Sequence, residues 1–129
     1  MTEKNKKQFG VWMDLHNATI TGREHIDTGK FIILGHILKL VAEPNTNEKT
    51  ANNAEIGLQL KYFKEITALM QNAEEIHITG TGIAQERLMH YMAETPQFKN
   101  TVAKESTSNK MSDENLTIYI AEKFNNALN

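Results

Sequence analysis

The chain has 129 residues, 40% of them hydrophobic and 23% charged, and its 14 basic and 16 acidic side chains give a formal net charge of -2. This composition is ordinary for one globular domain with its own core. It excludes the class of strongly basic domains that bind free nucleic acid through most of their surface. The absence of cysteine excludes disulfides, thiolate zinc sites and a cysteine nucleophile.

The first eight residues are expected to form a flexible basic leader, followed by a single domain at residues 9–129. The leader contains Lys4, Lys6 and Lys7. Such a leader is usually solvated, and the alternative is contact with RNA or another polyanion. It lacks the apolar run of a signal peptide, and the longest apolar stretch, residues 31–42, is too short to span a membrane. We therefore expect a cytoplasmic protein with no membrane partner.

The first half of the domain contains three apolar runs that favour β-strands. Asp14 and Asn17 separate the first two runs, and their side chains favour a turn because they bond to nearby backbone groups. A second turn is expected around Gly29. Connections this short favour antiparallel pairing of neighbouring strands. The expected strands cover residues 9–15, residues 18–23 and a third run from residue 30 to as far as 41.

The second half alternates helices with strands. Residues 43–53, EPNTNEKTANN, form a polar loop that is either functional or a plain mobile connection. Apolar residues at steps of three or four then predict helices over residues 53–72, 83–93 and from Ser112 or Asp113 onward, with strands at 75–79 and 101–105. The side chains expected to face the core are Ile56, Leu60, Phe63, Thr67 and Met70, widened by Tyr62, Ile66 and Leu69, then Ile83, Leu88, Tyr91 and Met92, and finally Leu116, Tyr119, Ile120 and Phe124.

The order β-β-β-α-β-α-β-α predicts an α/β fold with a mixed five-stranded sheet. The three leading strands form an antiparallel meander, and the last two strands join the sheet in parallel through right-handed crossovers. Helices then cover both faces of the sheet. This pattern resembles the ribonuclease H-like fold.

The fold resemblance implies an enzymatic hypothesis, a metal-dependent nuclease or phosphoesterase. Ribonuclease H-like nucleases gather carboxylates around divalent metal ions, and Asp14 and Glu55 stand near two of the expected positions. The end of the fourth strand carries residues 79–82, TGTG, where a further acid is expected, so the acidic site is incomplete. Asp113 and Glu114 near the last helix are candidates for the missing carboxylate. They are explained equally well as acidic residues in the first turn of that helix, where the helix dipole favours them. Because the acidic site is incomplete, the preferred interpretation of Asp14 is that it forms a turn.

Other catalytic and cofactor motifs are missing from the sequence. The five histidines show no tight spacing typical of metal ligands, although a site made from distant members stays open. The serines Ser106, Ser108 and Ser112 fall in a polar loop, and no G-x-S-x-G elbow is present. We therefore expect no metal site and no cofactor.

The stretch TGTG joins the fourth strand to the second helix. Glycine permits positive φ and close backbone approach, and the N–H groups at a helix start attract anions. The stretch lacks the Lys-Ser/Thr of a P-loop, and Gln85 stands where a G-x-G-x-x-G fingerprint needs glycine. Two interpretations stay open: a purely structural corner, or an anion or RNA contact made by Thr79, Gly80, Thr81 and Gly82.

Three stretches resemble a family of translation proteins. They are FGVWMDLHNATI at residues 9–20, EIHITGTGIAQERL at residues 75–88, and the segment at residues 98–124. Their pattern is similar to the central domain of archaeal and eukaryotic class-1 release factors and their ribosome-rescue relatives, and to small bacterial stand-alone proteins grouped as translational machinery components. The resemblance covers roughly residues 8–125. It implies a ribonuclease H-like fold and association with the ribosome or RNA.

One departure limits what the resemblance implies. Release factors carry Gly-Gly-Gln in the loop before the long helix, and no Gly-Gly-Gln occurs in this chain. Gln59 follows Gly57-Leu58 but lies within the predicted helix. The leading hypothesis is therefore a non-enzymatic domain that binds the ribosome or RNA through TGTG, residues 45–53 and the N-terminal lysines. The alternatives are the nuclease with its incomplete acidic site and a protein-interaction or self-assembling module, which would form a homo-oligomer.

Overall fold

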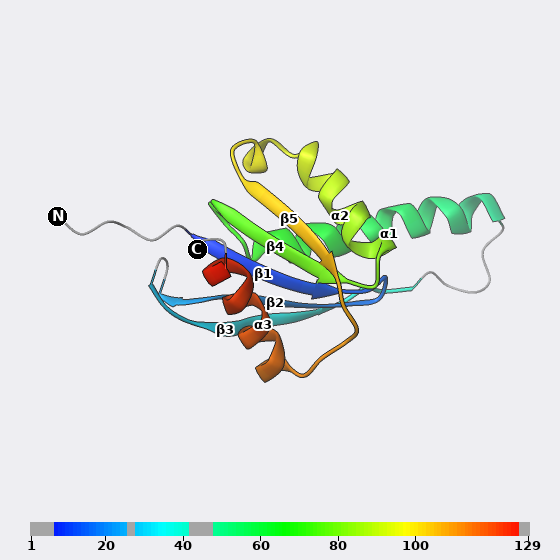
Figure 1. The fold of residues 1–129 in the computed structure, drawn as a ribbon. Helices are drawn as coiled ribbons and strands as arrows, with labels where there is room; N and C mark the ends of the chain where they lie inside the picture. Colours follow the sequence, from blue (N-terminus) through cyan, green and yellow to red (C-terminus); the bar gives the residue numbers. More distant parts are fainter. Residues whose placement is uncertain (1–6, 26–27, 42–47, 127–129) are drawn as a thin grey trace.

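Three strands come first in the computed structural model and helices alternating with strands follow, which confirms the expected order (Figure 1). The structure describes residues 7–25, 28–41 and 48–126. The elements are β1 (Gln8–Met13), β2 (Asn17–His25), β3 (Thr28–Leu38), α1 (Glu48–Ala68), β4 (Glu75–Gly80), α2 (Ile83–Ala93), the 3-10 helix η1 (Pro96–Phe98), β5 (Val102–Thr107) and α3 (Asp113–Asn126).

The five strands form one mixed sheet with the order β3-β2-β1-β4-β5. β1 pairs antiparallel with β2, and β2 pairs antiparallel with β3, so the leading strands form the expected meander. β4 pairs in parallel with both β1 and β5. The register places Met13 beside Ala18 on one side and Gly80 on the other. The predicted α/β fold with a mixed five-stranded sheet is confirmed.

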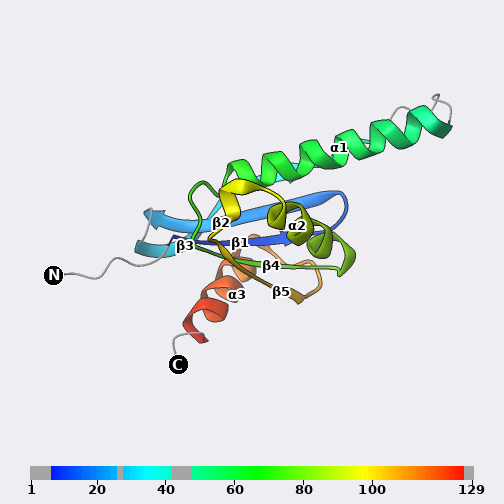
Figure 2. The same ribbon diagram turned by 90° about the horizontal axis from the view of Figure 1, so that it is seen from above.

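Helices cover both faces of the sheet, as the ribonuclease H-like pattern predicts (Figure 2). Successive side chains of β1 point to opposite faces and supply two cores. The larger core lies under α1 and α2, where Val11, Ile66 and Leu88 are fully buried. The smaller core lies under α3 and consists of Trp12, Phe31, Leu116, Ile120 and Phe124.

The first half of α1 extends past the strands (Figure 2), and this explains two differences from the prediction. The helix begins at Glu48, so the second half of the polar loop predicted at residues 43–53 is helical, while residues 42–47 lie outside the described residues. A helix that does not pack on the sheet needs no apolar stripe, so its start is hard to recognise. Ile56 and Leu60 are 60% and 46% exposed, and the prediction that they face the core is wrong. The second half buries Tyr62, Phe63, Ile66, Thr67 and Met70 as predicted.

Elsewhere the element bounds differ from the predicted ones by a few residues. β5 continues through Ser106 and Thr107, which the sequence places in a polar loop, because they pair with Thr79 and Gly80 of β4. Ile83 is 57% exposed and does not face the core as predicted, because it is the first residue of α2, beyond the end of β4. No helix in the described ranges combines the length and apolar character needed to cross a membrane.

Candidate functional site

The corner between β4 and α2 requires both of its glycines. A Cβ on Gly80 would lie 2.0 Å from the carbonyl oxygen of Met13, so no side chain fits there. Gly82 has a φ of 123°, a conformation that other residues rarely adopt. The carbonyl oxygen of Gly80 accepts the N–H of Ser108 at 2.8 Å, which ties the corner to the end of β5. Strand packing and the turn explain the two glycines.

The surroundings of this corner are acidic. The N–H of Gly82 donates to Gln85 Oε1 at 2.8 Å, so this donor already has an acceptor. The hollow beside the corner is lined in part by Glu86 and Glu105, whose charges repel an anion. Anion or RNA binding by residues 79–82 stays a prediction, and these two features do not favour it.

Of the three N-terminal lysines, Lys7 alone lies within the described residues. Its carbonyl oxygen accepts the backbone N–H groups of Glu74 and Glu75 at 2.9 and 3.1 Å, which fixes the start of β1 beside β4. Lys4 and Lys6 lie outside the described residues. RNA contact by these lysines stays a prediction.

Asp14 forms the predicted turn. Its Oδ1 accepts the backbone N–H groups of His16 at 2.7 Å and Asn17 at 2.6 Å, as Asp side chains do in turns. The hydroxyl of Tyr62 donates to the Asp14 carbonyl oxygen at 3.0 Å and joins the turn to α1. The carboxylate of Asp14 therefore has a structural role at the end of β1.

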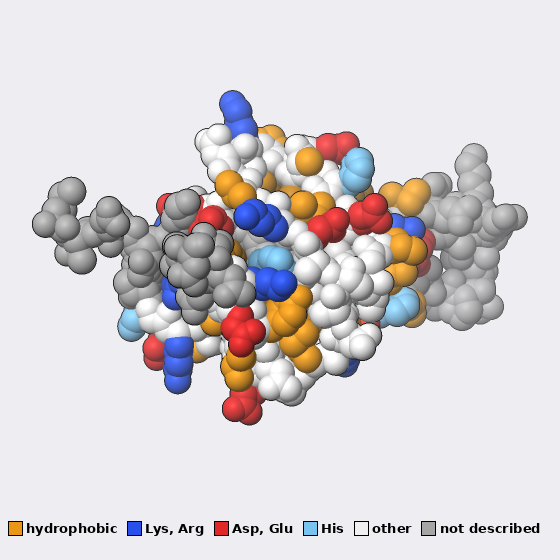
Figure 3. Space-filling model, in the orientation of Figure 1, with side chains coloured by type: hydrophobic (Ala, Val, Ile, Leu, Met, Phe, Trp, Pro, Cys, Tyr) orange, Lys and Arg blue, Asp and Glu red, His pale blue; other side chains and the backbone are white. Residues whose placement is uncertain are grey.

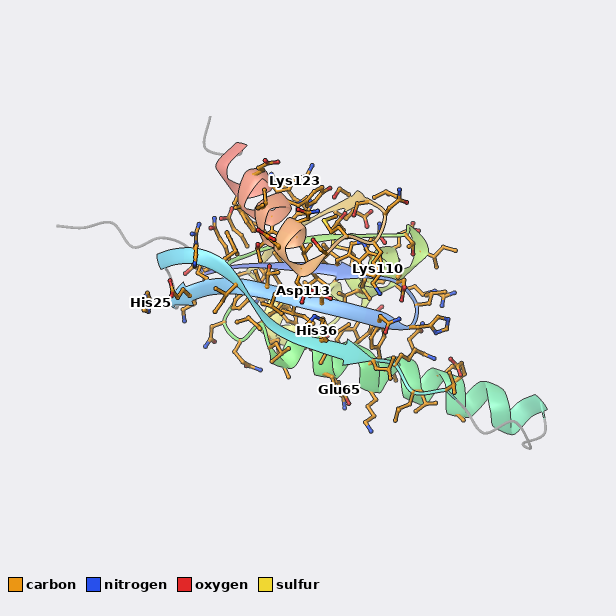
Figure 4. All side chains as sticks on the ribbon, turned by 90° about the horizontal axis from the view of Figure 1, so that it is seen from below. His25, His36, Glu65, Lys110, Asp113 and Lys123 are labelled. Atoms are coloured by element: carbon orange, nitrogen blue, oxygen red, sulfur yellow. The ribbon has the colours of Figure 1, made fainter. Side chains whose placement is uncertain are left out.

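Two further carboxylates of the nuclease hypothesis, Glu55 and Asp113, are paired with bases. Glu55 pairs with Lys39, whose side chain is only 5% exposed. Asp113 at the start of α3 lies 2.9 Å from His36 Nε2 of β3 (Figure 4). The part of the chain that the structure describes contains no group of three or more His, Asp or Glu side chains suited to a metal ion. The structure does not complete the acidic site.

A polar cluster lies on the α3 side of β4 and β5. The parallel register pairs His77 with Lys104 and Thr79 with Ser106, so these four side chains share one face. Tyr119 Oη reaches this face from α3 and contacts Ser106. We refer to this cluster as the polar ledge, which consists of His77, Thr79, Lys104, Ser106, Ser108, Tyr119 and Lys123.

Ser106 is the centre of the polar ledge. Its Oγ lies 2.8 Å from His77 Nε2, 2.9 Å from Thr79 Oγ1 and 2.8 Å from Tyr119 Oη. A hydroxyl has one hydrogen and two lone pairs, so three contacts use its full capacity. Thr79 Oγ1 continues the chain to Ser108 Oγ at 2.7 Å. Ser106 is thus held in place and has no free position for attack on a substrate in this arrangement.

Two buried side chains, Gln85 and Trp12, hold the end of β5 and the residue that follows it. Gln85 is 2% exposed, and its Nε2 donates to the carbonyl oxygen of Ser106 at 2.8 Å. Trp12 Nε1 donates to the carbonyl oxygen of Ser108 at 3.4 Å. The end of β5 is therefore fixed to both α2 and β1.

Burial and the nearby lysines together affect the protonation of the polar ledge. Burial, together with the charges of Lys123 and Lys104, lowers the pKa of His77 to about 4, so the imidazole is neutral at neutral pH. Burial opposes ionisation of Tyr119, but hydrogen bonds with Ser106 and Thr79 and the nearby Lys123 ammonium outweigh it and lower the pKa of the phenol. Lys123 Nζ lies 5.2 Å from the centroid of the Tyr119 ring.

Sequence reasoning missed the polar ledge, although one signal for it exists. Polar side chains alternate at positions 77 and 79 and again at 104 and 106. In parallel neighbouring strands such alternation marks a shared polar face. The arrangement offers two ammonium groups beside a chain of hydroxyl groups that ends at Ser108, which suits contact with an anionic ligand.

No protein-family model and no curated protein matches the chain, whereas solved structures match it in fold. The crystal structure of the Thermoplasma acidophilum Pelota protein is 20% identical over 96% of this chain, with a TM-score of 0.58. The Archaeoglobus fulgidus Pelota structure is 11% identical over 92% of this chain, with a TM-score of 0.59. The chain covers 33% and 31% of these Pelota chains, about a third of each. At such identities the matches show a shared fold.

Proposed function

We propose that this chain is a non-enzymatic, translation-associated domain that binds the ribosome or RNA. The observation that carries the proposal is the fold match to Pelota proteins over 96% and 92% of the chain. A fold alone serves many functions. The second support is therefore the resemblance of residues 9–20 and 75–88 to release factors and their ribosome-rescue relatives.

The chemistry of the chain supports binding rather than catalysis. Asp14 holds a turn, and Glu55 pairs with Lys39. The sequence has no Gly-Gly-Gln, and Gln59 lies inside α1 rather than at a loop tip. The hydrolytic role of release factors is therefore not part of the proposal.

Phosphate contacts are the proposed source of affinity. The sequence assigns them to residues 79–82, to residues 45–53 and to Lys4, Lys6 and Lys7. Lysines that neutralise phosphates release counterions, so binding weakens as the salt concentration rises. Of these three regions the lysines suit phosphate best, because carboxylates line the hollow beside residues 79–82.

Sedimentation with purified bacterial ribosomes tests the proposal. The chain and ribosomes are centrifuged through sucrose at about 50 mM and about 300 mM KCl, because phosphate contacts are salt-dependent. We expect the chain in the pellet at low salt and in the supernatant at high salt. A chain that stays wholly in the supernatant at low salt contradicts the proposal.

A matched pair of variants tests the N-terminal lysines. K4E/K6E/K7E is expected to reduce the pelleted fraction at low salt. The control K61E/K64E/K99E makes the same charge change at exposed positions on α1 and after η1, and is expected to pellet like the wild type. An equal loss in both variants would show that net charge matters and that the N-terminal lysines have no specific role.

A protein-interaction or self-assembling module is the second candidate, because apolar side chains are exposed where β3 ends near α1. Lys39 follows β3 and pairs with Glu55, so the two segments lie side by side. The exposed fractions there are 64% for Leu38, 52% for Leu40, 72% for Val41 and 60% for Ile56. Exposed apolar patches are typical of protein interfaces. Light scattering distinguishes a dimer from the 14.6 kDa monomer, and a monomer at high concentration counts against self-assembly.

A further inference from the structure

We infer that the polar ledge is the surface through which this domain contacts the phosphate backbone of RNA. The inference rests on the proposed function and gives it a specific site. This site differs from the TGTG corner and from the N-terminal lysines. RNA is the expected occupant because the ledge offers positive charge, polar side chains held in place and an open surface.

The polar ledge is open because α3 packs against the other half of the sheet. α3 contacts β1, β2 and β3, and Phe124 of α3 stacks on Phe31 of β3 with ring centroids 5.6 Å apart. β4 and β5 lie on the other side of β1, and β5 is the edge strand. Figure 3 shows this face, with lysine or arginine side chains beside a histidine near its middle. A polymer can lie along such a surface without entering a cleft.

Two exposed lysines give the polar ledge its positive charge. Lys104 on β5 and Lys123 on α3 both lie close enough to His77 to affect its ionisation. The ion pairs seen among the described residues, His36–Asp113 and Lys39–Glu55, involve neither lysine. Glu75, two residues before His77 on β4, accepts a hydrogen bond from Gln8 at 2.8 Å. The two ammonium groups are therefore available to a phosphate.

Hydroxyl groups of the polar ledge are held in place before a ligand arrives. Tyr119 Oη and Ser108 Oγ lie at the two ends of the hydroxyl chain that passes through Ser106 and Thr79. Ser106 Oγ donates its hydrogen to Thr79 Oγ1, so it accepts from both His77 Nε2 and Tyr119 Oη. Side chains held in this way lose little conformational entropy when they bind. Ser108, at the end of the hydroxyl chain, complements the lysines, since a phosphate accepts both charged and neutral hydrogen bonds.

Fluorescence anisotropy with a fluorescein-labelled single-stranded RNA of about 20 nucleotides tests the inference, because that length spans more than one binding site of a small domain. K104E/K123E is expected to weaken affinity at least about tenfold at low salt. It should also reduce the slope of log Kd against log salt by about 1.4, since each lost phosphate contact removes about 0.7. The control K61E/K64E makes the same charge change on α1, on the opposite face, and should change affinity less than about twofold.

Three outcomes overturn the inference: no RNA binding by the wild type at low salt, equal affinity of K104E/K123E and the wild type, or an equal loss in both variants. Circular dichroism verifies that each variant is folded. K104M/K123M, which removes charge without adding repulsion, replaces the reversal variant if that variant unfolds, and a loss of at least about fivefold is expected.

Ribosome sedimentation separates this inference from the proposed function. If the wild type and K104E/K123E pellet equally, the polar ledge is not the contact surface, whereas ribosome association stands. If the wild type stays in the supernatant while K104E/K123E alone loses affinity for the RNA oligonucleotide, the ledge stands and ribosome association is contradicted.

Discussion

Ser106 Oγ lies 2.8 Å from Tyr119 Oη, although the two residues are 13 positions apart and belong to β5 and α3. This contact joins the edge strand of the sheet to the last helix. It also places the phenol beside Thr79 and Lys123, so the parts of the polar ledge form one hydrogen-bonded unit. The ionisation of its side chains therefore reports whether the ledge is assembled.

Tyr119 is predicted to ionise at lower pH than Tyr62. Hydrogen bonds and Lys123 lower the pKa of Tyr119, whereas burial and then the charge of Asp14 raise that of Tyr62. Ultraviolet difference absorbance of the phenolate should show an early transition that disappears in Tyr119→Phe. Lys123→Met should move this transition to higher pH, while Lys64→Met on α1 should not. An unmoved transition in Lys123→Met would show that the ammonium does not act on the phenol.

His77 is predicted to make stability depend on pH. Its pKa is lowered from 6.5 to about 4 in the folded chain, so the unfolded chain takes up the proton first as pH falls. The stability that neutral His77 contributes is full above pH 6.5 and is lost as pH falls toward 4. Urea unfolding at a series of pH values should show a shallower decline in His77→Gln than in the wild type. The control His25→Gln, at an exposed position, should keep the wild-type decline, and an NMR titration of the His77 ring near 6.5 would contradict the lowered pKa.

Two glycines are predicted to respond in opposite ways to alanine. Gly80→Ala places a methyl group 2.0 Å from the Met13 carbonyl oxygen, so we expect a loss of at least about 3 kcal/mol in the free energy of unfolding, as for other severe steric changes. Gly57 lies within α1 with nothing near its Cβ position, so Gly57→Ala should stabilise by about 0.5–1 kcal/mol through helix propensity. Chemical denaturation measures both. A Gly80→Ala variant as stable as the wild type would contradict the close strand packing.

The two halves of α1 are predicted to differ in their contribution to stability. Ile66 is fully buried, and Ile66→Ala should cost about 2–5 kcal/mol. Ile56 is 60% exposed, so Ile56→Ala should change the free energy of unfolding by less than about 0.5 kcal/mol. Similar losses at both positions would mean that the first half of α1 packs against the rest of the domain.

The role of Asp14 is predicted to be structural. Asp14→Asn keeps an oxygen that accepts the N–H groups of His16 and Asn17, so stability should change little. Asp14→Ala removes both bonds and should cost about 1 kcal/mol. Denaturation of both variants checks this. Calorimetric magnesium binding by the wild type that is lost in Asp14→Asn would instead favour the nuclease hypothesis.

Most of the fold could be predicted because its signals are local. The alternation in residues 75–79 and the helical spacing in residues 83–93 were enough to place β4 and α2. The start of α1 was not predictable, because its first half extends past the strands (Figure 2) and residues 48–53 include no large apolar side chain. The end of β5 was missed because Ser106 and Thr107 are polar, and only pairing with β4 holds them in a strand.

Less of the candidate site could be predicted, because it depends on register between distant segments. The TGTG corner was visible in the sequence, although its acidic surroundings come from Glu86 and from Glu105 on a different strand. The polar ledge requires that residue 77 pairs with residue 104 and that Tyr119 faces Ser106. Neither relationship follows from spacing along the chain. Tyr119 packs against the smaller core, as predicted, and nothing in the sequence indicated that its hydroxyl also contacts Ser106.

Direct titration with ribosomes is the most decisive test of translation-associated binding. The chain has no cysteine, so Ala93→Cys at the exposed end of α2 allows a single dye to be attached. Anisotropy of the labelled chain should rise saturably as purified ribosomes are added at about 50 mM KCl and should fall back as salt is raised. Anisotropy that stays at the free-chain value up to micromolar ribosomes at low salt would contradict the proposed function.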